Sequence, residues 1–117
     1  MSICKKIVGF VKQKMLCVKW RIKNPHNTTV VNGLFPIEKV SVGKKTYGTL
    51  NIVWMCQDAK ISIGNYCSIA PKVEFLVGGE HNYHRISTWP FQSMVYGEKT
   101  KAEINRDIII EDDVWIG

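Results

Sequence analysis

The chain has 117 residues, of which 45% are hydrophobic and 22% charged, and its formal net charge is +6. This length fits one domain, and the sequence contains neither an apolar run near the roughly 18 residues of a membrane-spanning helix nor the clean apolar core of a signal peptide. The four cysteines form no CxxC pair and no metal-ligand spacing, so we expect reduced thiols, no metal and a cytoplasmic protein.

The positive charge is confined to the N-terminal part of the chain. Residues 1–37 contain seven basic residues and no acid, whereas the remainder carries nine bases against ten acids. A nucleic-acid-binding domain presents a basic face on its folded surface. The distribution therefore indicates one basic element and no nucleic-acid partner.

Residues 1–23 are predicted to form this basic element as an amphipathic helix that ends before Asn24-Pro25. Its apolar residues recur three or four apart: Ile3, Ile7, Phe10, Val11, Met15, Val18 and Ile22. We expect this stripe to dock on the body of the protein. Contact with an anionic membrane surface is the alternative, and both interpretations require an apolar face.

Residues 24–39 are predicted to be a polar connecting segment, because asparagine, proline and glycine punctuate them. Residues 40–117 are predicted to form one domain of β structure, with a break at Gly48 and an excursion at about residues 78–107. Loops of this length in a compact fold usually carry function.

A six-residue repeat runs through this domain. Ile63, Ile69 and Phe75 lie six apart, and a small or branched residue precedes each of them by two positions. Units of the same kind begin at Val42 and Ile110. A period of six fits neither a helix nor a hairpin, but it is typical of a parallel β-helix, in which each hexapeptide forms one side of a coil.

The sequence stops at Gly117, two residues into another unit. A coil cannot bury its apolar face without a stacked neighbour or a terminal cap. We therefore expect a truncated form of a longer protein, with completion of the coil by a partner chain or a swapped segment as the alternative.

Two histidines, His81 and His84, stand in the excursion within the segment GGEHNYHRISTWPF. Histidine has an ordinary pKa near 6.5 and can act as a general base at neutral pH. A solvated loop histidine is the alternative for each. A zinc site is disfavoured, because no third ligand has suitable spacing.

The run IGNYCSIAPKVEFLVGGEHNYHRISTWPF, followed by DDVWIG, resembles the hexapeptide-repeat acetyltransferases of the xenobiotic type, which acetylate chloramphenicol and streptogramins. Relatives of that group modify sugars in surface polysaccharide biosynthesis. The resemblance covers residues 40–117. It implies an incomplete left-handed parallel β-helix, acetyl-CoA as co-substrate, a small-molecule hydroxyl acceptor and a homotrimer.

The resemblance also implies roles for individual residues. The family's catalytic histidine stands six residues before the serine of its Ser-Thr-x-Pro-Phe motif, which is Ser87 here, so His81 would be the general base. Tyr47 and Trp115 would bind the acceptor substrate, with packing at a coil corner as the alternative role for both.

Two features depart from the family pattern. The family's acetyl-CoA site is formed mostly by coils after the Val-Trp-Ile-Gly motif, which here would lie beyond Gly117, and Glu111 replaces a glycine of the repeat. We therefore expect an O-acetyltransferase whose activity as this chain is weak or absent. The alternative is a non-catalytic β-solenoid fragment that serves as a binding or assembly module.

Overall fold

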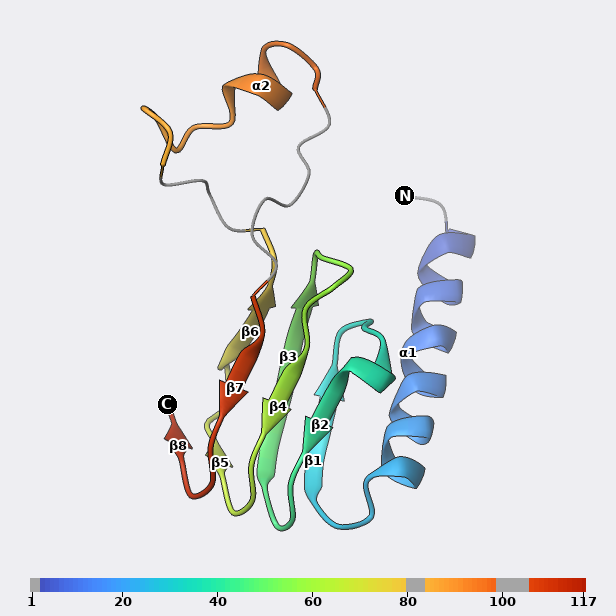
Figure 1. Ribbon diagram of the computed structural model, residues 1–117. Coiled ribbons are helices and arrows are strands. Elements are labelled where there is room, and N and C mark those ends of the chain that lie inside the picture. The colour runs from blue at the N-terminus through green and yellow to red at the C-terminus, as the bar shows by residue number, and fades with distance from the viewer. Residues whose placement is uncertain (1–2, 80–83, 99–105) are drawn as a thin grey trace.

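The computed structural model describes residues 3–79, 84–98 and 106–117. Helix α1 (Ile3–Lys23) stands at one end of a stack of parallel strands, and β8 (Trp115–Ile116) lies at the other end (Figure 1). Between them the chain is mostly sheet. The expectation of a mainly β protein with an N-terminal helix is therefore confirmed.

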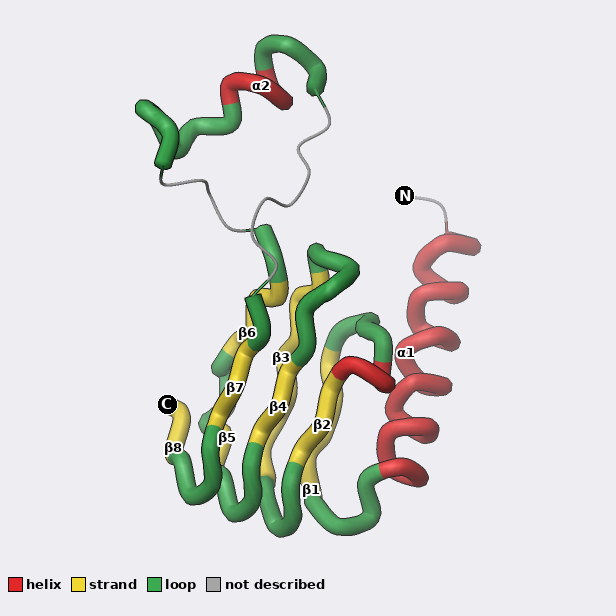
Figure 2. Tube along the Cα trace, in the orientation of Figure 1, coloured by secondary structure: helices red, strands yellow, loops and turns green. Residues whose placement is uncertain are grey.

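The strands form two sheets in which every pairing is parallel (Figure 2). One sheet has the order β1–β3–β5–β8, with β6 also paired to β3, and the other has the order β2–β4–β7. The bounds are β1 Thr28–Asn32, β2 Val40–Val42, β3 Tyr47–Trp54, β4 Ile61–Ile63, β5 Ser68–Ile69, β6 Glu74–Val77 and β7 Ile108–Ile110. The chain passes between the sheets repeatedly, and each return adds the next strand to the stack.

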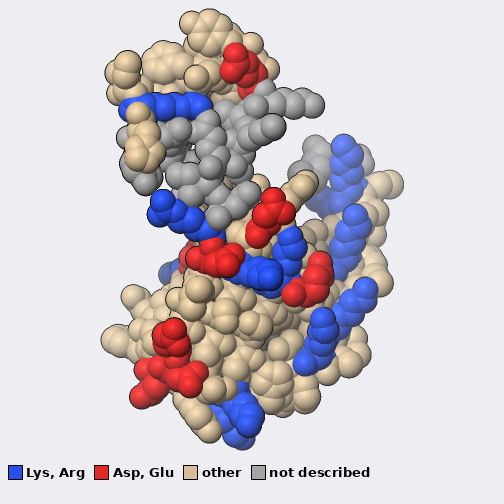
Figure 3. Space-filling model, in the orientation of Figure 1, with Lys and Arg blue, Asp and Glu red and all other residues tan. Residues whose placement is uncertain are grey.

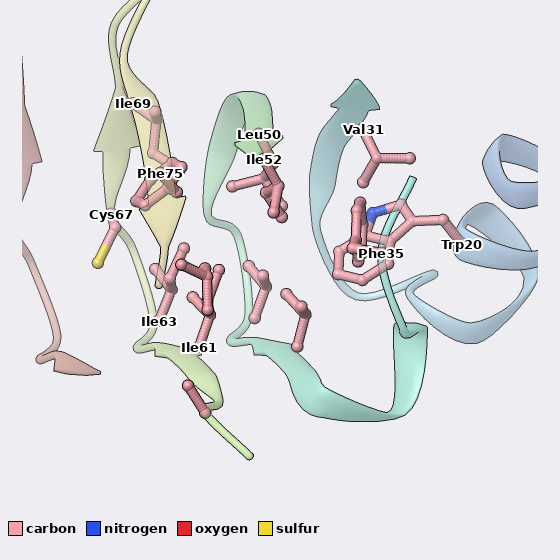
Figure 4. Packing of buried hydrophobic residues seen from close by; sticks show 14 of the residues in the cluster. Trp20, Val31, Phe35, Leu50, Ile52, Ile61, Ile63, Cys67, Ile69 and Phe75 are labelled. Carbon is pink, nitrogen blue, oxygen red and sulfur yellow. The ribbon is translucent and has the colours of Figure 1, made fainter. Parts of the chain in front are cut away.

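The strand register aligns the predicted repeat units. Val42 pairs with Ile63, and Ile63 pairs with Ile110, so the aliphatic residues of three units form one inward row. Val42 and Ile63 are buried, and Ile110 is half-buried at the end of the row. Leu50, Ile52, Ile69 and Phe75 converge on the same interior (Figure 4). The six-residue period therefore marks residues whose burial holds the strands together.

Glycines permit the close approach of successive turns of chain at one corner of the stack. A Cβ added to Gly43 would lie 2.6 Å from the carbonyl carbon of Gly64, and one added to Gly64 would lie 2.7 Å from the backbone nitrogen of Asp112. Both distances are below any normal contact. Glu111 occupies the corresponding position in the next turn, as the pairing of Ile63 with Ile110 requires.

At the same corner the backbone is left-handed, and side-chain oxygens accept hydrogen bonds from backbone N–H groups of the neighbouring turn. Lys45, Tyr66 and Asp113 have φ values of 60°, 58° and 59°. The Asn65 side-chain oxygen accepts a hydrogen bond from the Lys44 backbone N–H at 2.7 Å, and an Asp112 carboxylate oxygen accepts one from the Asn65 N–H at 2.6 Å. These side chains satisfy backbone donors where the chain leaves the sheet.

Helix α1 closes the first end of the stack through Trp20, which is 1% exposed. The Trp20 ring meets Phe35 edge-on at a centroid distance of 6.0 Å (Figure 4). Its indole N–H donates to the Thr29 hydroxyl at 3.1 Å. Arg21 donates to the carbonyl oxygens of Thr29, Asn24 and Asn27. The helix thus acts as the cap that a stack of repeats needs.

The expectation that the apolar stripe of this helix docks on the body is wrong. The seven residues of that stripe are all exposed, by 48% to 76% of their surface: Ile3, Ile7, Phe10, Val11, Met15, Val18 and Ile22. The docked face instead carries Gln13, Leu16, Cys17 and Trp20. The face of α1 that packs is the one that carries Trp20, a large aromatic residue with a hydrogen-bonded indole. It is not the face with the larger number of aliphatic residues.

The segment predicted as a connection contains an additional strand. β1 lies within residues 24–39 and supplies the first layer of the larger sheet, and a short 3-10 helix, η1 (Ile37–Lys39), follows it. The predicted break at Gly48 is also displaced. Gly48 lies inside β3 with a φ of 117°, and the interruption falls at residues 43–46.

The predicted excursion leaves the stack after β6 and returns at β7. Gly78 and Gly79, with φ values of 83° and 76°, turn the chain past Met55 and Cys56. On return, the Asp107 carboxylate accepts a hydrogen bond from the Lys60 N–H at 2.8 Å. The described part of the excursion includes a short helix, α2 (Phe91–Met94), beyond the ends of the strands (Figure 1).

Candidate functional site

A row of outward-facing side chains crosses the larger sheet at the start of its strands. Thr28 pairs with Tyr47, Tyr47 with Ser68, and Ser68 with Trp115. We call these four residues the outer row. Neighbouring parallel strands lie about 4.8 Å apart. The row therefore places one aromatic residue on each side of one serine, and the backbones of the two aromatic residues lie about 10 Å apart.

The corner before each strand positions this row. Thr46 and Cys67 stand one residue before Tyr47 and Ser68, and both are fully buried. The Thr46 hydroxyl donates to the Gly64 carbonyl at 2.8 Å and accepts from the Cys67 N–H at 3.0 Å. Since side chains alternate along a strand, an inward residue fixed at this point directs the next one outward.

Tyr47 and Trp115 are largely exposed, by 55% and 78% of their surfaces, whereas Ser68 is half-buried between them. An exposed tryptophan of this kind contributes little to a core. The outer row can offer ring faces for stacking and hydroxyl groups for hydrogen bonds, which suits a small polar ligand with an apolar face.

A polar hollow of about 400 Å³ lies beside this row, on the same face of β3. Thr49 and Asn51 line it, two and four positions after Tyr47, together with Asn32, Pro71, Lys72 and Glu74. The Asn51 amide is fixed at both ends, accepting from Asn32 at 3.0 Å and donating to the Val73 carbonyl at 2.9 Å. The hollow therefore adds preorganised polar groups to the aromatic row.

The two sequence-predicted acceptor residues, Tyr47 and Trp115, are thus brought into one row, although they are far apart in the sequence. His81 lies outside the described residues. Sequence reasoning missed Thr28 and Ser68. Ser68 had a usable signal, because it follows the inward Cys67 in the same way that Tyr47 follows Thr46.

The other predicted histidine, His84, is exposed within the described part of the excursion. It lines a hollow of about 480 Å³ with Trp89, Phe91 and Tyr96, among others. Trp89 and Phe91 meet edge-on at 4.4 Å, and the Ser87 hydroxyl accepts from the Trp89 N–H at 3.1 Å. Ser87 therefore has a structural role in the turn before α2.

Cys67 is part of the packed corner before β5. Cys67 has no exposed surface, and its thiol donates to the Glu111 carbonyl oxygen at 3.1 Å. No group of three histidine, cysteine, aspartate or glutamate side chains that could hold a metal ion occurs among residues 3–79, 84–98 and 106–117.

Over 65 aligned residues the chain is 38% identical to a protein of Lysinibacillus sphaericus described as a probable macrolide acetyltransferase. The alignment covers 50% of this chain and 36% of that protein, so the chain spans little more than a third of the curated relative that it matches. No family model and no solved structure matches the chain. Half of the chain is therefore similar to part of an acetyltransferase.

Proposed function

We propose that this chain is part of an acetyl-CoA-dependent acetyltransferase that transfers the acetyl group to a hydroxyl of a sugar or another small acceptor. The observation that carries the proposal is the 38% identity to a probable macrolide acetyltransferase. The outer row supports the acceptor class, because aromatic faces and hydroxyl groups together suit a polyhydroxylated ring.

The proposed fold is a left-handed parallel β-helix. The inward row of Val42, Ile63 and Ile110 supports this fold, as do the two all-parallel sheets. Corners with left-handed backbone at Lys45, Tyr66 and Asp113 recur at matched positions in successive turns. Matched corners are what a coil built from identical short sides requires.

His81 is the proposed general base. Its imidazole takes the proton of the acceptor hydroxyl while the oxygen attacks the thioester carbonyl carbon of acetyl-CoA. The C–S bond then breaks, and coenzyme A leaves as the thiol after protonation. General-base assistance of this kind contributes roughly 10² to 10⁴ in rate. The family resemblance and the position of His81 six residues before Ser87 support this role.

The proposed assembly is a homotrimer in which neighbouring subunits share each site. The arrangement of β3 supports this. The outer row crosses β3 at Tyr47, whereas the excursion leaves the stack beside Met55, at the other end of the same strand. A base carried by the excursion and an acceptor bound at the outer row would meet more readily between two subunits than within one.

A second candidate function is a non-catalytic binding or assembly module. Glu111 favours it, because the residues at the corresponding corner, Gly43 and Gly64, leave no room for a side chain beneath the next turn. A further turn stacked in the same register would meet the Glu111 side chain. In the proposed enzyme, turns of that kind would hold acetyl-CoA.

An acetyl-transfer assay with a panel of sugars and macrolides tests the proposal. The release of the coenzyme A thiol measures the rate. His81→Ala should lower turnover by about 10² to 10⁴, whereas His84→Ala, the matched control in the same excursion, should leave it nearly unchanged. Equal rates for the His81 variant and the unaltered chain would remove the assignment. Calorimetric titration with acetyl-CoA separates the two candidates, since a folded sample that gives binding heat supports the acetyltransferase and excludes the non-catalytic module.

A further inference from the structure

Helix α1 exposes an apolar face that the fold leaves uncovered. Its docked face holds Trp20 and Leu16, and the opposite face carries aliphatic side chains over about 20 residues of helix. Val11, Val18 and Ile22 on that face are exposed by 48%, 60% and 75% of their surfaces. Exposed apolar patches of this extent mark binding surfaces in soluble proteins.

Lysines border this face along the whole helix. Lys5, Lys12 and Lys19 follow one another at seven-residue spacing, so they lie along one side of it. On the other side Lys14 lies among the apolar residues, close to Ile7 and Phe10, with its ammonium group 5.4 Å from the centre of the Phe10 ring. All four are exposed, α1 contains no acidic residue, and Lys and Arg side chains follow the length of the helix (Figure 3).

An apolar groove continues the same surface. It has a volume of about 710 Å³ and lies between α1 and residues 34–38. Met15 and Ile22 belong to both the groove and the exposed face, and Lys12, Lys19 and Lys23 stand along the groove. The apolar surface bordered by lysines is therefore broader than the helix alone.

We propose that this face of α1 lies on an anionic lipid bilayer, with its apolar side chains among the acyl chains and its lysines at the phosphate groups. Buried apolar area and attraction to anionic headgroups are the two terms that bind such helices to membranes. No described helix is long and apolar enough to cross a membrane, which leaves a position parallel to the surface for α1.

A second copy of the helix fits this face less well. Cys4, Val8, Val11, Met15, Val18 and Ile22 are spaced as in a coiled-coil seam, but five of the six positions beside that seam are cationic: Lys5, Lys12, Lys14, Lys19 and Arg21. Two such helices would face each other with lysine against lysine or arginine. The exposed face is also wider than a seam, because Ile3, Ile7 and Phe10 extend it on one side. Both features favour an anionic surface over another copy of this helix.

Flotation of the full chain with vesicles tests the proposal. Binding is expected with phosphatidylcholine vesicles that contain 30 mol% phosphatidylglycerol, and little binding with phosphatidylcholine alone. Lys12→Gln with Lys19→Gln should weaken the partition coefficient by about 25-fold, since each lysine near such a surface contributes about a factor of five. Val11→Asn with Val18→Asn should weaken it by more than about tenfold.

Matched controls are available elsewhere on the surface. Lys44→Gln with Lys45→Gln removes two exposed charges at the strand corner, and Ile109→Asn removes an exposed aliphatic residue from β7. Neither should change vesicle binding by more than about twofold. Circular dichroism and the thermal midpoint confirm that each variant remains folded.

Three outcomes would overturn the proposal. The first is equal binding to anionic and neutral vesicles, and the second is equal loss of binding in the helix variants and their controls. The third is a protein that does not bind vesicles but forms an oligomer, by light scattering, which the Val11 and Val18 substitutions dissociate. That result would assign the face to a second copy of the chain.

Discussion

Tyr47 and Trp115 both pair in register with Ser68, one on each side, so two aromatic residues separated by most of the repeat domain flank a single hydroxyl group. The three residues occupy successive parallel strands and share the outward face. The excursion between residues 78 and 107 separates β5 from β8 in sequence without displacing one from the other in the sheet.

Replacing Trp115 with alanine should impair acceptor binding without unfolding the protein. The ring is 78% exposed, so the free energy of unfolding should change by less than about 0.5 kcal/mol. The proposed stacking on the acceptor would be lost, and the KM for the acceptor should rise about tenfold, as expected for an aromatic contact worth about 1 to 1.5 kcal/mol. Initial rates at varied acceptor concentration measure this.

Ile109→Ala is the matched control, because Ile109 lies on β7 in the other sheet and is 68% exposed. It should leave the acceptor KM unchanged. Equal effects of the two substitutions would assign Trp115 to general packing at the end of the stack, and the outer row would lose its proposed role.

Gly64→Ala should destabilise the fold strongly. The new Cβ would lie 2.7 Å from the Asp112 backbone nitrogen and 2.7 Å from the Glu111 carbonyl carbon, so the neighbouring turn must move. We expect a loss of at least about 2 kcal/mol in the free energy of unfolding, measured by urea titration.

Gly9→Ala should instead raise the free energy of unfolding in the same urea titration. Gly9 lies within α1, and no heavy atom stands within 4 Å of its added Cβ. Alanine should stabilise the helix by about 1 kcal/mol. A stable Gly64→Ala variant would show that the turns tolerate a wider spacing than the structure has.

The inward rows could be predicted from the sequence, because each six-residue unit buries one aliphatic residue. This pattern is local and is the same for every unit of the stack. It did not predict β1, since Thr29 and Val31 lie inward in a strand too short to show a period of six. The docked face of α1 was also missed. Trp20 and its partners Thr29 and Phe35 define that face, and contacts between distant segments leave no periodic trace in the sequence.

The left-handed corners should tolerate glycine better than their neighbours do. Lys45 has a φ of 60°, which costs a residue with a side chain roughly 1 kcal/mol, so Lys45→Gly should be neutral or slightly stabilising. Lys44 is equally exposed but has no positive φ, and Lys44→Gly should destabilise by about 0.5 to 1 kcal/mol. Thermal unfolding of the pair measures the difference, and a larger loss for Lys45→Gly would contradict the assigned corner geometry.

The junction between α1 and the strands should depend on both the volume and the polarity of Trp20. Trp20→Ala leaves a cavity at a residue that is 1% exposed, and we expect a loss of about 3 to 5 kcal/mol in the free energy of unfolding. Trp20→Phe keeps part of the contact with Phe35 but loses the indole donor to Thr29 and some ring volume, so it should cost about 1 to 2 kcal/mol. Urea unfolding followed by circular dichroism compares the two variants directly.

Because the Thr29 hydroxyl also donates to the Asn27 side chain at 2.7 Å, it keeps one partner in the phenylalanine variant. Equal losses for alanine and phenylalanine would mean that the hydrogen bond, rather than the packed ring, holds the cap in place.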